Sequence, residues 1–115
     1  MLAQIPPTTI DDLFVHRFQA DQILVVRGSF VLVVLQNRQY QYIGLSEDLP
    51  KVVKIPPFVP HGAINLSLEP AVLVNALLRH GAAHERDYQP LARPFAYDLE
   101  AAKFKSTQQC YPTSV

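Results

Sequence analysis

The stretch from Val53 to Ser67 reads Val-Lys-Ile-Pro-Pro-Phe-Val-Pro-His-Gly-Ala-Ile-Asn-Leu-Ser, and it decides the fold. Its three prolines fix the backbone angle φ and lack an N–H donor, so the stretch runs extended into a constrained turn and does not form a helix. Gly62 then lets the backbone reverse closely. Side chains alternate between the two faces of the strand that follows, which places His61 and Asn65 on the same face. We expect that face to be either a polar site or an edge in contact with water.

The length and composition indicate one soluble domain. A chain of 115 residues can bury a sizeable core as a single domain. Its one cysteine, Cys110, excludes an intrachain disulfide and fits a reducing compartment. The ten basic and ten acidic residues are interspersed, which argues against nucleic acid or an anionic membrane as partner. No apolar run reaches the length of a membrane helix, and the first residues do not resemble a signal peptide, so a cytoplasmic location is expected.

The N-terminal third indicates extended structure. Residues 1–11 are predicted as an extended arm whose apolar side chains would lie on another surface, such as that of a partner subunit. Asp12 to Phe18 predicts a strand. The apolar, β-branched runs Gln22 to Val26 and Ser29 to Leu35 predict a hairpin that reverses at Gly28.

Further strands are predicted in the middle of the chain. After a reversal at Asn37-Arg38, Gln39 to Ile43 alternates polar and apolar residues, as a strand with one wet face does. Lys51 to Ile55 predicts a strand that ends at the prolines. Ala71 to Leu78 is too continuously apolar to show a face; its length favours a buried strand, with a helix as the alternative.

The C-terminal part is predicted to contain one helix. Arg79 to Arg93 is polar and broken by glycine and proline, which indicates irregular structure. Tyr97 to Lys105 has apolar residues near one helical face and acidic residues early, and the last ten residues resemble a tail. Seven or so strands at intervals of about ten residues predict an antiparallel sandwich or barrel. We expect one domain, with its β core over 12–90 and the helix and tail over 91–115.

Two motifs resemble those of the cupin superfamily. Asp21-Gln22-Ile23-Leu24-Val25-Val26-Arg27-Gly28, preceded by His16, is similar to the first cupin motif, and the segment from Ile55 to Asn65 is similar to the second. The residue pattern of the second motif is most similar to that of the dTDP-4-dehydrorhamnose 3,5-epimerase branch and related sugar-nucleotide proteins. The resemblance covers roughly residues 12–90. It implies an all-β jelly roll, the double-stranded β-helix, with a ligand pocket in the barrel, and it implies a homodimer.

The resemblance also suggests a metal site. Metal-binding cupins typically use two histidines and a glutamate from the first motif and one histidine from the second. Here Phe14 replaces the first histidine, while His16, Asp21 and His61 match the remaining positions. Two imidazoles and a carboxylate suit zinc, iron, manganese or nickel. A metal-free pocket is the favoured alternative, because one imidazole is lost and the acid is shorter.

The comparison with the epimerase branch gives one candidate catalytic residue. His16 matches the histidine that acts as base there, and a neutral imidazole can remove a proton from a carbon next to a carbonyl. The lysine expected to steady the enolate is not evident, since Gln22 or Ile23 occupies its region. Tyr88 lies beyond the core strands, so the tyrosine of the family has no clear match. Candidates for binding a diphosphate are Arg17, Arg27 and Arg38.

The sequence therefore predicts a protein that binds a small polar ligand, such as a carbohydrate or sugar nucleotide, in a barrel pocket. The predicted pocket contains His16, Asp21, His61 and Asn65, and further ligand contacts are assigned to Tyr40, Tyr42 and Arg27. The alternatives are an isomerase or epimerase with His16 as base, a metal-dependent enzyme, and a purely structural module.

Several residues also have a purely structural interpretation. His16 can be a core histidine with satisfied hydrogen bonds, His61 can bond across its own turn, and Asn65 can satisfy the backbone groups next to it. Tyr40 and Tyr42 share one strand face and are expected either to stack on a ligand or to cover the core. His80 and His84 are expected in a solvated loop and are not assigned to a site. Cys110 in the predicted tail is not expected to be catalytic.

Overall fold

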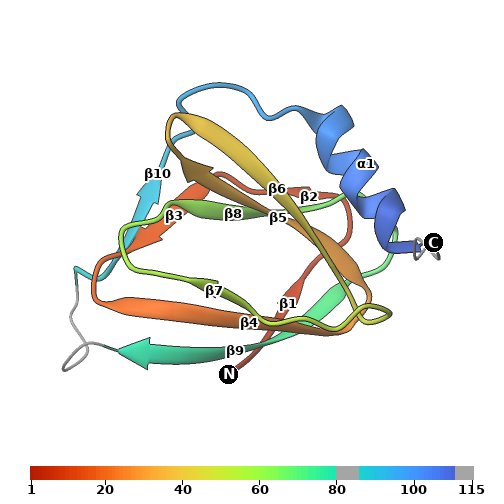
Figure 1. Cartoon of the computed structure of the whole chain (residues 1–115), viewed down its shortest axis with the longest axis horizontal. Coiled ribbons are helices and arrows are strands. Elements are labelled where there is room, and N and C mark those ends of the chain that lie inside the picture. Colours follow the sequence, from red (N-terminus) through yellow and green to blue (C-terminus); the bar gives the residue numbers. More distant parts are fainter. Residues whose placement is uncertain (80–85, 111–115) are drawn as a thin grey trace.

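Two antiparallel sheets face each other in a computed structural model, which describes residues 1–79 and 86–110, except for the side chains of 107–110. One sheet has the strand order β1-β9-β4-β7 and the other β10-β3-β8-β5-β6, with β2 also paired to β8 (Figure 1). The elements are β1 Leu2–Ile5, β2 Thr9–Ile10, β3 Leu13–His16, β4 Gln19–Arg27, β5 Ser29–Gln36, β6 Gln39–Ser46, β7 Val53–Ile55, β8 His61–Asn65, β9 Ala71–Arg79, β10 Tyr88–Leu91 and α1 Leu99–Cys110. The predicted all-β jelly roll with a short C-terminal helix is confirmed.

Strand β5 is apolar on both faces because both faces are covered. Phe30, Leu32 and Val34 pack into the core between the sheets. Val31 and Val33 point the other way, into a second core beneath α1 and the segment that precedes it. The helix thus covers the outer face of the second sheet, on the side away from the first sheet (Figure 1). In the described part of the chain, no helix is long and apolar enough to span a membrane.

The reversal at Asn37-Arg38 is confirmed, but the predicted hairpin at Gly28 is wrong. Asn37 and Arg38 have φ values of 54° and 62°, as a tight hairpin turn requires, and they join the paired strands β5 and β6. Strands β4 and β5, in contrast, belong to different sheets. Gly28, with φ of 76°, turns the chain from one sheet to the other, and a Cβ there would lie 2.7 Å from the Pro70 carbonyl oxygen.

The predicted N-terminal arm is part of the sheets. Strand β1 pairs with β9, and β2 pairs with β8. Ala3 and Ile5 pack against the core of their own chain. The segment is extended as expected, and the surface on which Ala3 and Ile5 lie belongs to the same chain.

The C-terminal part also differs in detail from the prediction. The segment expected to be irregular contains β10, which pairs with β3. The predicted helix is confirmed but runs from Leu99 to Cys110, so it includes residues assigned to the tail. It begins after Asp98, whose Oδ1 accepts hydrogen bonds from the backbone N–H groups of Glu100 and Ala101, a typical N-cap. His80 and His84 lie outside the described residues.

Candidate functional site

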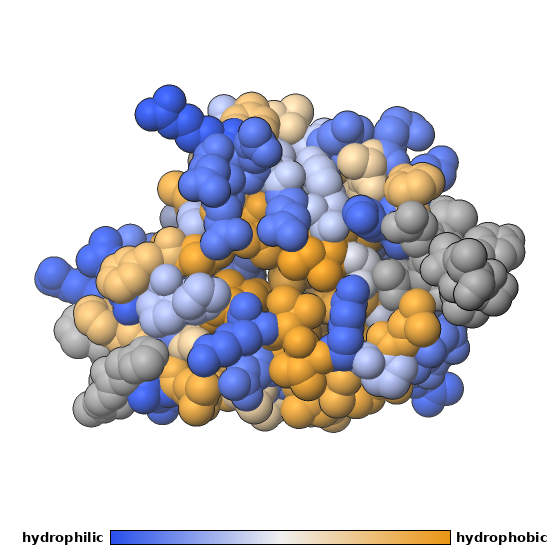
Figure 2. Space-filling model, viewed as in Figure 1, coloured by the Kyte–Doolittle hydropathy of each residue, from blue (hydrophilic) through white to orange (hydrophobic). Residues whose placement is uncertain are grey.

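A cavity of about 450 Å³ lies between the two sheets. In the view of Figure 2, apolar side chains gather in the hollow between them. Most of the lining is apolar, from Met1, Ala3, Ile5, Phe14, Ile23, Phe30, Leu32, Ala63, Leu73 and Leu77, with Gly62 and Tyr88. The remaining lining residues are polar, namely Asp11, His16, Gln19, Asp21, His61 and Asn75. The volume falls within the range of small-molecule sites.

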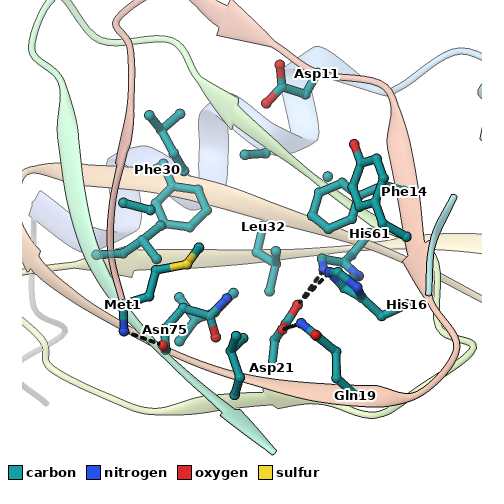
Figure 3. Close-up of a pocket in the computed structure, with 18 residues that line it drawn as sticks. Met1, Asp11, Phe14, His16, Gln19, Asp21, Phe30, Leu32, His61 and Asn75 are labelled. Carbon is teal, nitrogen blue, oxygen red and sulfur yellow. Dashed lines mark hydrogen bonds and ion pairs between the residues drawn. The ribbon is translucent and has the colours of Figure 1, made fainter. Parts of the chain in front are cut away.

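Three polar side chains from different strands converge on the cavity wall. His16 ends β3, Asp21 lies in β4, and His61 begins β8. Oδ2 of Asp21 is 3.7 Å from Nε2 of His16 and 3.3 Å from Nε2 of His61. Asp21 and His61 are only 3% and 2% exposed. Figure 3 shows the three side chains together, with Gln19 beside Asp21.

The protonation of His61 follows from its neighbours. Nδ1 of His61 lies 3.0 Å from the carbonyl oxygen of Val59, which can only accept, so Nδ1 carries a hydrogen. In the neutral ring Nε2 is then an acceptor, and it faces the acceptor oxygen of Asp21. Their separation is that of an ion pair without the alignment of a hydrogen bond, and Nε2 has no hydrogen-bond partner among the described residues. Two acceptors that face each other repel, so this arrangement is favourable only if Nε2 of His61 is protonated or if a ligand donates a hydrogen bond to these atoms.

His16 is held in the same tautomer by Asp87. Nδ1 of His16 lies 2.6 Å from Oδ2 of Asp87, whose Oδ1 accepts hydrogen bonds from the backbone N–H groups of Arg17 and Phe18 at 3.1 and 2.6 Å. A carboxylate with these donors is ionised, so His16 donates from Nδ1. Nε2 of the neutral ring is then a free lone pair on the side of Asp21, at the cavity wall.

Both carboxyl groups favour their ionised forms. Burial acts to raise the pKa of Asp21, but the contacts with His61 and Gln19 and the charge of His16 outweigh it, so the pKa lies below its ordinary value. At Asp87 burial is likewise outweighed, here by the N–H group of Phe18 and by His16, and the pKa of this carboxyl is also lowered. The site therefore keeps two negative charges around two imidazoles at neutral pH.

The proline segment positions both histidines through its backbone. The N–H group of Phe58 donates to the carbonyl oxygen of His16 at 2.7 Å, and the adjacent Val59 accepts from His61. Phe58 has φ of 69°, which is unfavourable for a bulky residue, and its side chain is 67% exposed. The strained turn thus links the ends of β3 and β8 next to the cavity.

The structure brings together only some of the predicted site residues. His16, Asp21 and His61 line one cavity, as predicted. Asn65 shares the buried face of β8 but does not line the cavity; its amide donates to the carbonyl oxygens of Ile5 and Glu69. Arg27 is exposed near the end of β4, also outside the lining. The ligand contacts predicted for these two residues are therefore not made in this cavity.

Tyr40 and Tyr42 lie on the opposite face of the second sheet. They pack against the core beneath α1. The Tyr40 hydroxyl donates to the carbonyl oxygen of Phe95, and the Tyr42 hydroxyl accepts from the N–H group of Asp98. Their hydroxyl groups hold the segment that leads into the helix. Of the two roles expected for them, the structure supports the one in which they cover a core, and they do not line the cavity.

Sequence reasoning missed Asp87 and Gln19. Asp87 is 71 residues from His16 along the chain and precedes a strand that was predicted to be irregular. The pairing of Tyr88 with His16 brings it into place. Gln19 donates to Oδ1 of Asp21 at 3.0 Å. Its position two residues before Asp21, on the same face of a strand, was the available signal.

The predicted metal set has suitable donors but not a metal-binding arrangement. His16, Asp21 and His61 offer two imidazoles and a carboxylate, a combination that transition metals accept. Within residues 1–79 and 86–110, however, no group of three His, Cys, Asp or Glu side chains is placed to hold a metal ion. These three side chains, as they are placed, therefore do not fit a transition-metal ion.

Comparisons with known proteins place the fold. No protein-family model matches the sequence, and no curated protein does. A dTDP sugar isomerase from Desulfovibrio desulfuricans is 16% identical over 84% of this chain and 68% of its own, with a TM-score of 0.71. A protein with a double-stranded β-helix domain from Klebsiella pneumoniae is 17% identical over 80% and 72%, with a TM-score of 0.59.

The capsular polysaccharide assembling protein CapF from Staphylococcus aureus is 20% identical over 80% of this chain, with a TM-score of 0.69. The chain spans only 27% of CapF. Identities this low show the shared fold alone, which is the double-stranded β-helix.

Proposed function

We propose that this cupin-fold protein is a small-molecule isomerase or epimerase, in which His16 moves a proton at a carbon next to a carbonyl. The observation that carries the proposal is the 2.6 Å contact between His16 and Asp87, with the free Nε2 of the ring at the wall of the cavity. A similarly folded protein is described as a dTDP sugar isomerase, which supports the reaction class.

His16 has the features of a general base. Asp87 fixes the tautomer, so the lone pair on Nε2 faces the cavity. When Nε2 takes a proton, the imidazolium lies between Asp87, on its Nδ1 side, and Asp21, 3.7 Å from Nε2. Two carboxylates beside the ring stabilise that cation. A base positioned in this way contributes about 10²- to 10⁴-fold to a rate.

His61 supplies the complementary donor. Removal of the proton by His16 leaves the electron pair of the C–H bond in an enolate, whose negative charge develops on the carbonyl oxygen. No lysine or arginine lines the cavity in the described part of the chain, so the lysine expected from the sequence comparison is missing. A proton on Nε2 of His61, held by Asp21, can pass to the enolate oxygen. Return of the proton by His16 on its own face restores the substrate. Epimerisation requires a proton from solvent on the opposite face of the carbon, while the enol gives its O–H proton back to His61 and His16 releases its proton to solvent.

The test is hydrogen exchange from solvent. In D₂O, we expect deuterium to enter the position next to the carbonyl group of a bound ketone. NMR detects the exchange, and the probes are a 4-keto-6-deoxy sugar nucleotide and a simple cyclic ketone. His16→Gln should slow exchange about 100-fold or more. Asp48→Asn, a change of an acid outside the cavity lining, is the matched control. Exchange by His16→Gln at the wild-type rate would refute the role of His16.

A second candidate function is binding of a small polar ligand without catalysis. The specific observation in its favour is Asp21, whose ionised carboxylate stands where an enolate would need positive charge. Ligand-induced thermal stabilisation without any deuterium exchange would favour this function.

We also propose a homodimer formed through the outer face of the first sheet. Leu2, Val74 and Leu24 are paired across β1, β9 and β4 on the face away from the core. Leu2 is 71% exposed and Val74 38%. The second sheet has α1 over its corresponding face, whereas no described element covers this one. Apolar patches of this kind mark association surfaces, and a second copy supplies the complementary face.

A further inference from the structure

We infer that the ligand of this cavity is an uncharged compound with an apolar body and one carbonyl-bearing end, and is not a sugar nucleotide. The inference rests on the proposed function for the polar end of the ligand. Most of the cavity wall is apolar, and a cluster of polar side chains lies at one end (Figure 3).

Four of the six polar side chains that line the cavity gather at one end, whereas Asp11 and Asn75 lie outside this cluster (Figure 3). His16, Gln19, Asp21 and His61 lie together, whereas Phe30 lies at the far side and Leu32 between them (Figure 3). These four polar residues are linked to one another by the contacts of Asp21. One cluster of this size can bind one polar group of a ligand.

The apolar walls do not suit a carbohydrate. Phe30, Leu32 and Leu73 are buried core residues that also line the cavity. A sugar carries hydroxyl groups around its whole ring, and hydroxyls that face such side chains would lose water without gaining a partner. An apolar ring or chain loses no hydrogen bonds against the same walls and gains from burial.

Among the described residues, the cavity lining offers no arginine, lysine or helix N-terminus to a diphosphate, and the N-terminal ammonium group of Met1 donates to the carbonyl oxygen of Asn75. Proteins bind phosphate with arginine, lysine or helix N-termini. In the described residues no arginine or lysine lines the cavity, and α1 lies over the outer face of the second sheet. Arg17, one of the predicted candidates, donates to Gln89. The ionised Asp21 would repel a phosphate instead.

The experiment compares binding of 4-phenylcyclohexanone with that of dTDP and a dTDP-4-keto-6-deoxy sugar, by calorimetry and by NMR of the intact protein. We expect the ketone to bind at least tenfold more tightly than either nucleotide. Leu77→Gln places an amide on the cavity wall and should weaken ketone binding about tenfold. Leu78→Gln is the matched control, because the next residue of β9 faces away from the cavity and is 46% exposed.

Three results would overturn the inference. They are tighter binding of a nucleotide, absence of ketone binding, and an equal effect of Leu77→Gln and Leu78→Gln in two folded variants. Deuterium exchange is a separate readout. If the ketone binds as expected but does not exchange, the ligand class stands and the proposed catalysis fails.

Discussion

Replacing Asp87 by asparagine tests how His16 is controlled. The carboxylate of Asp87 accepts hydrogen bonds from Nδ1 of His16 at 2.6 Å and from the N–H groups of Arg17 and Phe18 at 3.1 and 2.6 Å. Asparagine has only one carbonyl oxygen. If that oxygen stays with the two backbone donors, the amide NH₂ faces Nδ1 of His16, which must then become the acceptor.

The expected consequence is a reversed tautomer. Nε2 of His16 would carry the hydrogen and lose its lone pair, so the base would be absent from the cavity. We expect deuterium exchange to fall about 100-fold or more. Loss of the charge-assisted contact should also lower the free energy of unfolding by about 1–2 kcal/mol.

Two measurements separate this effect from general destabilisation. The ¹⁵N chemical shifts of His16 report which ring nitrogen is protonated, and thermal unfolding reports stability. Asp48→Asn, which changes an acid away from the cavity, should alter neither. If the Asp87→Asn variant catalyses deuterium exchange at a rate within threefold of the wild-type rate, and Nδ1 of His16 is still protonated, then Asp87 does not set the tautomer of His16.

The remaining predictions concern the turn, alkaline stability, metal and assembly. Phe58→Gly removes a bulky side chain at φ of 69° and should raise the free energy of unfolding in urea by about 1 kcal/mol; a loss of that size would show that the residue is not strained. Burial raises the pKa of Tyr97 to about 12, and the unfolded chain ionises near 10. Stability should therefore hold below pH 10 and fall by up to about 3 kcal/mol as the pH rises to 12, and Tyr97→Phe should remove this decline; an unchanged decline would assign it elsewhere. Elemental analysis of the wild type and of His61→Ala should find no stoichiometric transition metal, and one bound ion per wild-type chain would contradict the arrangement described above. Val74→Lys should convert a dimer to a monomer in sedimentation velocity, while a wild-type monomer would remove the proposed interface.

The second motif was predictable because its signals are local. Proline fixes the entry to β8, and alternation along the strand turns His61 toward the core. The alternation of Gln39 to Ile43 likewise indicated a strand, but not which of its faces would meet α1. That choice depends on where the helix packs, so the sequence could not decide whether Tyr40 and Tyr42 contact a ligand or cover a core.

The features that escaped prediction depend on long-range pairing. Gly28 signals a turn through its backbone freedom, but that freedom does not reveal whether the next strand joins the same sheet. Asp87 reaches His16 only through the register of β10 on β3. His16 could be predicted from the sequence, whereas Asp87, which sets its tautomer, could be identified only from the fold.

The most direct test of the proposed function is deuterium exchange into a bound cyclic ketone at neutral pD, compared between the wild type and His16→Gln. The wild type should exchange the hydrogens next to the carbonyl, and His16→Gln should bind the ketone equally well but exchange about 100-fold more slowly. Equal exchange rates in the two proteins at saturating ketone would contradict the assignment of His16 as the base.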